Sequence, residues 1–156
     1  VAVLQRHGVR HALAALDGEL RAVGRQASGA PWAVALESPE VGLRTVHGVI
    51  ELEDLAVATS GDYRRFLRVG DARLAHTMDP HRRAPVNNAV ASVTVLARTG
   101  MHADAWATAL LVAGPDEGLA MAQRMGLDAL FLLRRAEGLV ALGLGRLGES
   151  AEPANG

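Results

Sequence analysis

The hydrophobic pattern of the chain changes near residue 98. Before that point, short apolar or alternating segments are separated by Gly, Pro and Asp, a pattern typical of β-strands. After it, residues 102–113 predict a helix, and Pro115 begins a second helix that Gly126 ends. Strands followed by helices predict an α+β fold with a mixed or antiparallel sheet and helices toward the C-terminal part. The predicted strands span residues 12–16, 32–37, 46–53, 55–59, 65–69, 74–76 and 91–97.

The two ends of the chain are less regular. Residues 1–7 predict the end of an amphipathic helix, with Gly8 as its stop. Residues 128–133 predict a last strand. Three glycines leave residues 136–147 either weakly helical or irregular, because each glycine weakens a helix. The last residues, 149–156, predict a disordered tail, so the folded unit is expected to span residues 1–148.

The composition excludes several kinds of chemistry. All 16 basic residues are Arg, which excludes a lysine Schiff base and a Walker lysine. The absence of Cys excludes disulfides, thiolate metal sites and cysteine nucleophiles. A formal net charge of −1 argues against a general attraction to nucleic acid or anionic lipid. No apolar run approaches the ~20 residues of a membrane span, and no signal peptide is visible, so a targeting segment upstream of Val1 stays an open expectation.

Two polar clusters follow predicted strands. Residues 59–63, Thr-Ser-Gly-Asp-Tyr, end a buried strand in a glycine turn whose backbone N–H groups suit a phosphate. An ordinary Asx or Ser turn is the alternative. Residues 76–80, His-Thr-Met-Asp-Pro, place His76 at a strand end, with Asp79 near enough to orient its imidazole or to cap the turn. His76 there suits a general base or a ligand contact, and a surface histidine is the alternative.

A third cluster lies on the first predicted helix. Asp104 and Thr108 are four residues apart, so their side chains share one face, in a stripe with Met101 and Leu111 that is expected to face inward. A carboxylate on such a stripe is costly unless it is paired or bound to a metal. Carboxylate and hydroxyl oxygens suit Mg²⁺, which keeps some water and bridges to phosphates. The alternative is that Asp104 caps the helix near its start.

The other histidines show no metal-ligand spacing and are predicted to be surface or packing residues: His7, His11, His47, His81 and His102. The pairs Arg64-Arg65 and Arg82-Arg83 are predicted to be solvated, and contact with a phosphate or an acidic partner is the alternative for each pair.

The order of these clusters resembles the C-terminal half of the ApbE family, the FAD:protein FMN transferases, over roughly residues 1–135. Five segments in family order and at family spacing carry the resemblance. They are Leu16-Asp17-Gly18-Glu19 with Gly24 and Pro31-Trp32, Ala58-Thr59-Ser60-Gly61-Asp62-Tyr63-Arg64-Arg65, His76-Thr77-Met78-Asp79-Pro80, Ser92-Val93-Thr94-Val95, and Ala103-Asp104-Ala105-Trp106-Ala107-Thr108-Ala109-Leu110.

The resemblance implies a T-fold-like α+β lobe with FAD in a cleft and Mg²⁺ against the pyrophosphate. It implies that FAD is cleaved, AMP is released and FMN becomes joined to a Thr or Ser of a target protein. It further implies the following roles: Asp104 and Thr108 bind the metal, His76 is the candidate base, and Thr77, Ser60, Gly61 and Asp62 line the cofactor cleft, with Gly18 and Glu19 near the nucleotide.

Two positions depart from the family pattern. Asp17 stands where the family has the first glycine of a turn, so Asp17 is strained if that position needs a positive φ. Arg82-Arg83 stand where the family usually has Thr-Gly, so that loop is expected to turn without its glycine.

Two other functions stay open beside flavin transfer: a non-catalytic FAD- or nucleotide-binding module of the same fold, and an FAD pyrophosphatase that releases FMN to water. The expected partners are FAD and an acceptor protein with a Thr or Ser site, and not nucleic acid. The match lacks the family's first lobe, which supplies further FAD and metal contacts, so exposed strand edges and an apolar lobe interface predict dimerisation or instability. The family suggests an extracytoplasmic or membrane-associated bacterial protein.

Overall fold

The structure is a computed structural model that describes residues 1–39, 45–63, 66–69 and 72–148. The predicted tail at 149–156 and the pair Arg64-Arg65 lie outside the described residues. The elements in chain order are α1 (Ala2–Arg6), β1 (Ala12–Leu16), β2 (Glu19–Val23), β3 (Trp32–Glu37), β4 (Val46–Leu52), β5 (Ala56–Gly61), β6 (Phe66–Val69), β7 (Ala72–Ala75), β8 (Met78–Asp79), β9 (Ala84–Pro85), β10 (Val90–Ala97), α2 (Gly100–Ala113), α3 (Pro115–Met125), β11 (Asp128–Arg135), β12 (Gly138–Leu144) and the 3₁₀ turn η1 (Gly145–Leu147).

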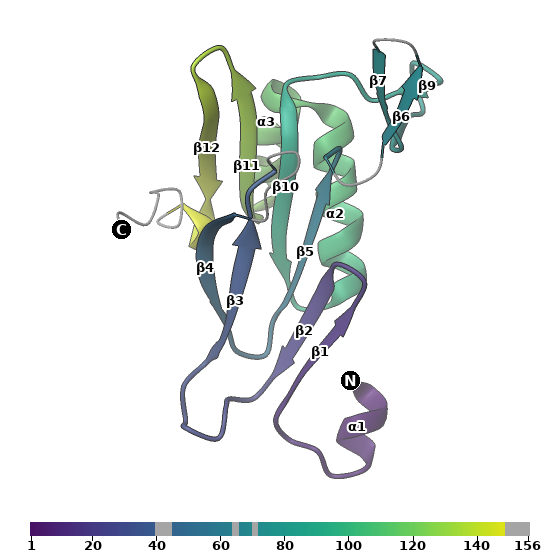
Figure 1. The fold of residues 1–156 in the computed structure, drawn as a ribbon. Helices are drawn as coiled ribbons and strands as arrows, with labels where there is room; N and C mark the ends of the chain where they lie inside the picture. The colour runs from purple at the N-terminus through teal and green to yellow at the C-terminus, as the bar shows by residue number, and fades with distance from the viewer. Residues whose placement is uncertain (40–44, 64–65, 70–71, 149–156) are drawn as a thin grey trace.

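A six-stranded sheet with the order β1-β2-β5-β10-β11-β12 forms the middle layer (Figure 1). Every neighbouring pair in it is antiparallel, so the prediction of an α+β fold with an antiparallel sheet is confirmed. Strand β10 lies near the centre and is buried from Val90 to Leu96. Both of its faces are covered, and for this reason its sequence is almost continuously apolar instead of alternating.

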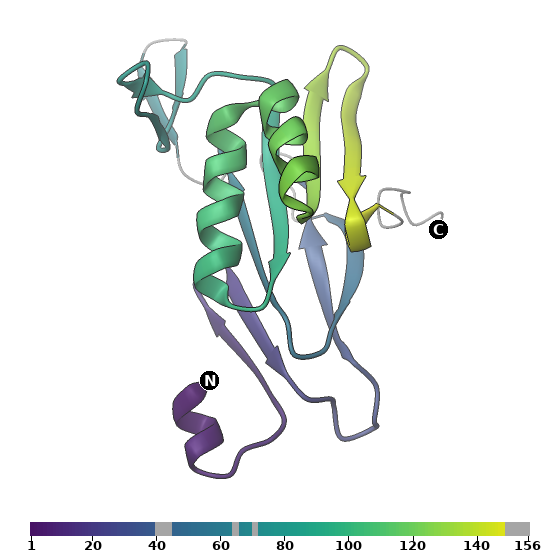
Figure 2. The ribbon, with the colours of Figure 1, turned by 180° about the vertical axis from the view of Figure 1, so that it is seen from behind.

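The two helices cover one face of the sheet (Figure 2). Thr99 caps the N-terminus of helix α2, and its hydroxyl accepts the N–H of His102 at 3.2 Å. Helix α3 begins at Pro115, and Gly126 in the left-handed conformation caps its C-terminus. Under the helices lies a core that joins α2 and α3 to β10 and β11, and each of its fully buried Leu or Phe side chains contributes roughly 1.5–3 kcal/mol. Its members are Val90, Val93, Val95, Ala107, Leu110, Leu111, Ala122, Ala129, Phe131 and Leu133.

The β3–β4 hairpin covers the opposite face of the sheet (Figure 1). Its inward positions pair as Trp32–Leu52, Val34–Ile50 and Leu36–Gly48, so one side of the hairpin is apolar and packs on the sheet. The core between them is a second cluster, separate from the one under the helices. Its members are Ala22, Val34, Leu36, Ile50, Leu52, Val57, Leu96, Leu130, Leu132 and Leu147.

The expectation that residues 136–147 are weakly helical or irregular is wrong for most of the segment. Residues Gly138–Leu144 form the edge strand β12, paired with β11 along its length. The glycines there permit close contacts: a Cβ on Gly143 would lie 2.0 Å from the carbonyl oxygen of Leu147, and one on Gly145 would lie 2.1 Å from Oδ1 of Asp128. They therefore accommodate the returning chain, which sequence spacing alone does not reveal.

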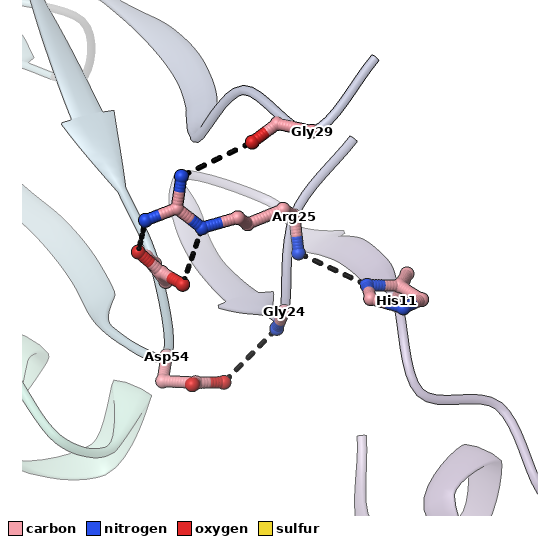
Figure 3. A network of polar contacts seen from close by, with 6 residues as sticks. His11, Gly24, Arg25, Gly29 and Asp54 are labelled. Atoms are coloured by element: carbon pink, nitrogen blue, oxygen red, sulfur yellow. Dashed lines mark hydrogen bonds and ion pairs between the residues drawn. The ribbon is translucent and has the colours of Figure 1, made fainter. Parts of the chain in front are cut away.

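A polar network centred on Arg25 ties together the loops that follow β2 and β4 and the segment before β1 (Figure 3). The Arg25 guanidinium donates through Nε and Nη2 to both carboxylate oxygens of Glu53 at 2.6 Å each, which raises the pKa of Arg25. The backbone N–H of Arg25 donates to Nδ1 of His11 at 3.1 Å, and that of Gly24 donates to Asp54 at 2.9 Å. Because Arg25 and Glu53 are exposed, the network fixes loop geometry more than it adds stability.

The remaining elements project from this body (Figure 1). Helix α1 contains no buried residue, and Val3 is 55% exposed. The small hairpins β6–β7 and β8–β9 lie at another corner of the molecule, and they carry His76 and Thr77 between them. Within the described residues, no helix has the length and apolar character needed to cross a bilayer.

Candidate active site

One cavity of about 390 Å³ draws its walls from both layers that flank the sheet. Its residues come from the β1–β2 turn, the hairpin strand β3, the end of β5, the segment after β7 and helix α2. They are Asp17, Gly18, Glu19, Leu20, Val34, Ala35, Leu36, Glu37, Thr59, Ser60, Gly61, Tyr63, His76, Thr77, Asp104 and Thr108. Of the nine candidate site residues, all except Asp62 are thus brought to one place.

The cavity exists because the sheet opens between β2 and β5. Strand β5 pairs with β10 all the way from Ala56 to Gly61, but its pairing with β2 is confined to Leu20–Val57 and Arg21–Ala56. Beyond Val57, this side of β5 has no strand partner among the described residues. The cavity lies along that unpaired side, where backbone groups of β5 are available to a ligand.

Hydroxyl groups on β5 point alternately to the two sides of the sheet. Ser60 lies on the helix side, where its Oγ is 2.8 Å from Oγ1 of Thr108. Thr59 lies on the hairpin side, where its Oγ1 is 2.8 Å from Oγ1 of the buried Thr94 on β10. The first of these bonds joins two candidate site residues that are 48 positions apart in the sequence.

Helix α2 presents Asp104 and Thr108 to the cavity, but not as the sequence pattern predicted. The buried stripe of α2 is Ala103, Ala107, Leu110 and Leu111. The expectation of an inward stripe through Met101 and Asp104 is wrong, since both are exposed and Met101 is 73% so. The small Ala103 and Ala107 let the helix approach β5 closely, and this turns Asp104 to the cavity edge. The capping alternative for Asp104 is also wrong, because Thr99 is the cap.

His76 and Thr77 lie between the small hairpins, with His76 exposed at the cavity wall. Below them, Asp79 caps its own turn: its Oδ1 accepts the N–H of His81 at 2.8 Å and of Arg82 at 3.1 Å. These bonds, that to Arg82 first, lower the pKa of Asp79. Of the two open roles for Asp79, capping is the one observed.

The departures from the family pattern are visible in the backbone. Arg83 has φ 53°, so the loop turns without a glycine, as expected. Asp17 has φ 55°, the left-handed conformation that strains a residue with a Cβ. Gly18 and Glu19 follow it into the cavity wall.

Asp62 does not line the cavity, which corrects the expectation for that residue. Its carboxylate forms a two-point ion pair with Arg134 on β11, with Nη1 to Oδ2 at 3.0 Å and Nη2 to Oδ1 as the second contact. Gly61 and Tyr63, the residues on either side of Asp62, do line the cavity. Sequence reasoning missed Arg134, because nothing local to it signals a partner 72 positions away.

Sequence reasoning also missed two cavity residues, Glu37 and Tyr63. The Tyr63 hydroxyl donates to Oε2 of Glu37 at 3.3 Å, and the Tyr63 ring lies over Gly61, where an added Cβ would be 2.7 Å from it. Tyr63 stood inside the recognised segment, and as the single tyrosine of the chain it was the available signal.

The cavity is acidic. The carboxylates of Asp17, Glu19, Glu37 and Asp104 line it, and among the residues that the structure describes no Arg does. These carboxylates repel a diphosphate, and a cation bound beside them would offset that repulsion. No group of three or more His, Asp or Glu side chains suited to a metal occurs among the described residues. The donors present, one carboxylate and one hydroxyl on adjacent turns of α2, fit Mg²⁺, which uses one or two carboxylates plus water and substrate phosphates.

The other histidines are placed as predicted, at the surface or in packing. His7, His11, His81 and His102 are exposed. His47 is half-buried on β4, its Nε2 has no hydrogen-bond partner, and burial lowers its pKa.

Fold and cavity together define a class: an α+β protein with an acidic, hydroxyl-lined cavity at a split in an antiparallel sheet. Within that class, the sequence profile of the ApbE family matches residues 1–131, so the chain belongs to the ApbE family. The predicted resemblance is confirmed.

Individual relatives agree. The FAD:protein FMN transferase of Vibrio cholerae is 39% identical over 135 residues, which are 86% of this chain and 40% of that protein. The protein of the same name from Haemophilus influenzae is 37% identical, over 88% of this chain and 40% of that protein. The chain thus spans well under half the length of these curated relatives.

Solved structures show the same relationship. The flavinyl transferase ApbE of Pseudomonas stutzeri superposes with a TM-score of 0.81 at 37% identity, over 96% of this chain and 46% of that one. The ApbE protein of Thermotoga maritima gives 0.78 at 30% identity, over 91% of this chain and 45% of that one.

Proposed function

We propose that this chain forms the C-terminal part of a Mg²⁺-dependent FAD:protein FMN transferase, which moves FMN from FAD to a Thr or Ser hydroxyl of a target protein and releases AMP. The observation that carries the proposal is that His76, Asp104, Thr108 and the Ser60-Gly61 segment, which are far apart in sequence, line one cavity. Its relatives are named as transferases of this kind.

Asp104 and Thr108 would hold Mg²⁺ at the cavity edge, where the ion would supply neutralisation of the diphosphate charge and Lewis-acid polarisation. The acidic lining supports this role, because a cation would offset the repulsion between the diphosphate and the four carboxylates among the described cavity residues. Gly18, Glu19, Gly61 and Thr77 would contact the nucleotide, the glycines through backbone N–H groups that a side chain would cover.

His76 would act on the acceptor. Its imidazole takes the proton from the Thr or Ser hydroxyl while that oxygen attacks the phosphorus on the FMN side. The new P–O bond forms, the P–O bond to the bridging oxygen breaks, and AMP leaves with that oxygen. Proton removal of this kind is typically worth ~10²–10⁴ in rate. The exposure of His76 suits it to meet a hydroxyl that a second protein brings.

The partners and setting follow from the same proposal. FAD and an acceptor protein are the substrates, and an extracytoplasmic or membrane-associated location is proposed from the family. Self-association is proposed from edge strand β12, where Val140 is 40% and Leu142 is 37% exposed. Light scattering on the purified chain tests this, and a stable monomer contradicts it.

The test of the activity is incubation of the protein with FAD, Mg²⁺ and a candidate acceptor, followed by mass spectrometry of the acceptor. The expected result is an added FMN with one AMP released per transfer. His76→Gln is expected to abolish transfer while FAD still binds, and His81→Gln, an exposed histidine outside the cavity, is the matched control.

Each alternative gives a different result. Free FMN and AMP without any acceptor indicate an FAD pyrophosphatase. FAD binding that is indifferent to Asp104→Ala and yields no AMP indicates a non-catalytic binding module. Failure of transfer to a competent acceptor contradicts the proposal.

A further inference from the structure

Arg134 lies outside the cavity, but it forms an ion pair with Asp62, the residue between the two wall residues Gly61 and Tyr63. Asp62 sits between Gly61 and Tyr63, which both line the cavity, while its own side chain pairs with Arg134. The pair spans the start of β10: Arg134 donates its backbone N–H to the carbonyl of Ala89 at 2.8 Å, and Asp62 donates its own to Ala91 at 3.3 Å. Asp62, just after β5, and Arg134, on β11, therefore lie on the two sides of the start of β10, and each is hydrogen-bonded there.

The geometry of the pair favours a fixed orientation. The two terminal guanidinium nitrogens of Arg134, Nη1 and Nη2, each contact one carboxylate oxygen of Asp62, and a two-point contact of this kind fixes direction as well as distance. The side chains are 37% and 23% exposed, so water screens the pair only in part. A Lys in place of Arg134 would keep the charge but would lose the two-point contact.

Beyond Asp62, a short chain of contacts leads into the cavity. The Tyr63 ring packs on Gly61, and the Tyr63 hydroxyl reaches Glu37 on the hairpin strand β3. The backbone on the N-terminal side of Asp62 carries Ser60, which is bonded to Thr108 on α2. A shift of Asp62 therefore displaces contacts with the hairpin and with the helix together.

We propose that Arg134 is a positioning residue for the cavity: through Asp62 it fixes the Gly61–Tyr63 backbone and thereby the place of the Tyr63 ring in the cavity wall. Arg134 touches no ligand in this role. The expected effect on ligand affinity rests on the proposed function. The expected effect on the position of the Tyr63 ring does not depend on the proposed function.

The first experiment uses the fact that the chain has one tyrosine. Protein labelled with 3-fluorotyrosine gives one ¹⁹F signal, that of Tyr63, without any ligand. The signal is expected to shift or broaden alike in Arg134→Gln and Asp62→Asn, to return toward its original position in Arg134→Lys, and to stay unchanged in Arg135→Gln, the exposed Arg one residue along. A wild-type signal in Arg134→Gln overturns the inference.

The second experiment is a double-mutant cycle on FAD affinity with Mg²⁺ present, each variant first shown to be folded by circular dichroism. Arg134→Gln and Asp62→Asn are each expected to weaken FAD binding about tenfold, and the double variant no further, because both act through one contact. Additive losses overturn the inference. If the wild type does not bind FAD, the proposed function fails, and the ¹⁹F signal still decides the role of Arg134.

Discussion

Ser60 and Thr108 share a hydrogen bond of 2.8 Å that ties the unpaired side of β5 to helix α2. Ser60 comes from a predicted phosphate-binding turn and Thr108 from a predicted metal site. Their bond makes these two features parts of one wall, so a change in either is expected to be felt at the other.

Thr108→Val is expected to lower the free energy of unfolding by about 1 kcal/mol, because it removes the hydroxyl and leaves Ser60 without this partner. It is also expected to weaken Mg²⁺-dependent FAD binding, whereas Thr108→Ser, which keeps the hydroxyl, retains both properties. Urea unfolding and a flavin fluorescence titration measure the two effects. Normal Mg²⁺-dependent binding by Thr108→Val would remove this residue from the proposed metal site.

Asp104→Asn is expected to reduce the gain in FAD affinity that Mg²⁺ brings by about tenfold or more, because the amide lacks the charge that holds the cation. The free energy of unfolding should stay within about 0.5 kcal/mol, since Asp104 is exposed and the change relieves repulsion among the cavity carboxylates. Calorimetric titrations with and without Mg²⁺ measure this. Glu51→Gln, the same charge change at an exposed position of β4, is the control and should leave the Mg²⁺ effect intact.

His47 is expected to make the fold sensitive to acid. Burial lowers its pKa below the usual 6.5, so below that pH the unfolded chain takes up a proton that the folded protein resists. The free energy of unfolding therefore falls as the pH drops from 6.5 toward the lower pKa of the folded state. Urea midpoints measured between pH 8 and pH 5 should fall less in His47→Gln than in the wild type or in His102→Gln. Equal pH dependence in all three proteins would show that His47 is not responsible.

Arg83→Gly is expected to raise stability by up to about 1 kcal/mol, because Arg83 has φ 53° and glycine adopts this conformation without strain. Arg82→Gly, the neighbour without a positive φ, should be neutral or destabilising. Thermal unfolding of the two variants decides. A loss of stability in Arg83→Gly would mean that the Arg83 side chain makes a contact that outweighs the strain.

Most strands and both long helices could be predicted from the sequence, because local signals define them. The alternation along β4, the Pro115 and Gly126 boundaries of α3, and the apolar run of β10 all depend on residues close in sequence. Strand β12 was not predicted, because a glycine in the sequence looks the same whether it lies in an irregular segment or in a strand that packs closely against a following turn. Gly143 is explained by Leu147 only after the chain has folded.

The site was predictable to the extent that recognised segments carry it. The segments with Ser60, His76 and Asp104 were found, and they line one cavity. The direction of each side chain could not be predicted as well. Asp62 points to Arg134 and not into the cavity, and Asp104 lies at an exposed edge of the cavity. Both outcomes depend on partners distant in sequence: a guanidinium on β11 in one case, and the close approach of Ala103 to β5 in the other.

The split between β2 and β5 also has a mechanical consequence. Its walls belong to the hairpin layer on one side, through Leu36 and Glu37, and to the helical layer on the other, through Asp104 and Thr108. A molecule bound there would contact two layers that lie on opposite faces of the sheet. Occupancy should therefore slow amide exchange in β3 and α2 in concert, so that the domain stiffens as a whole when it is loaded.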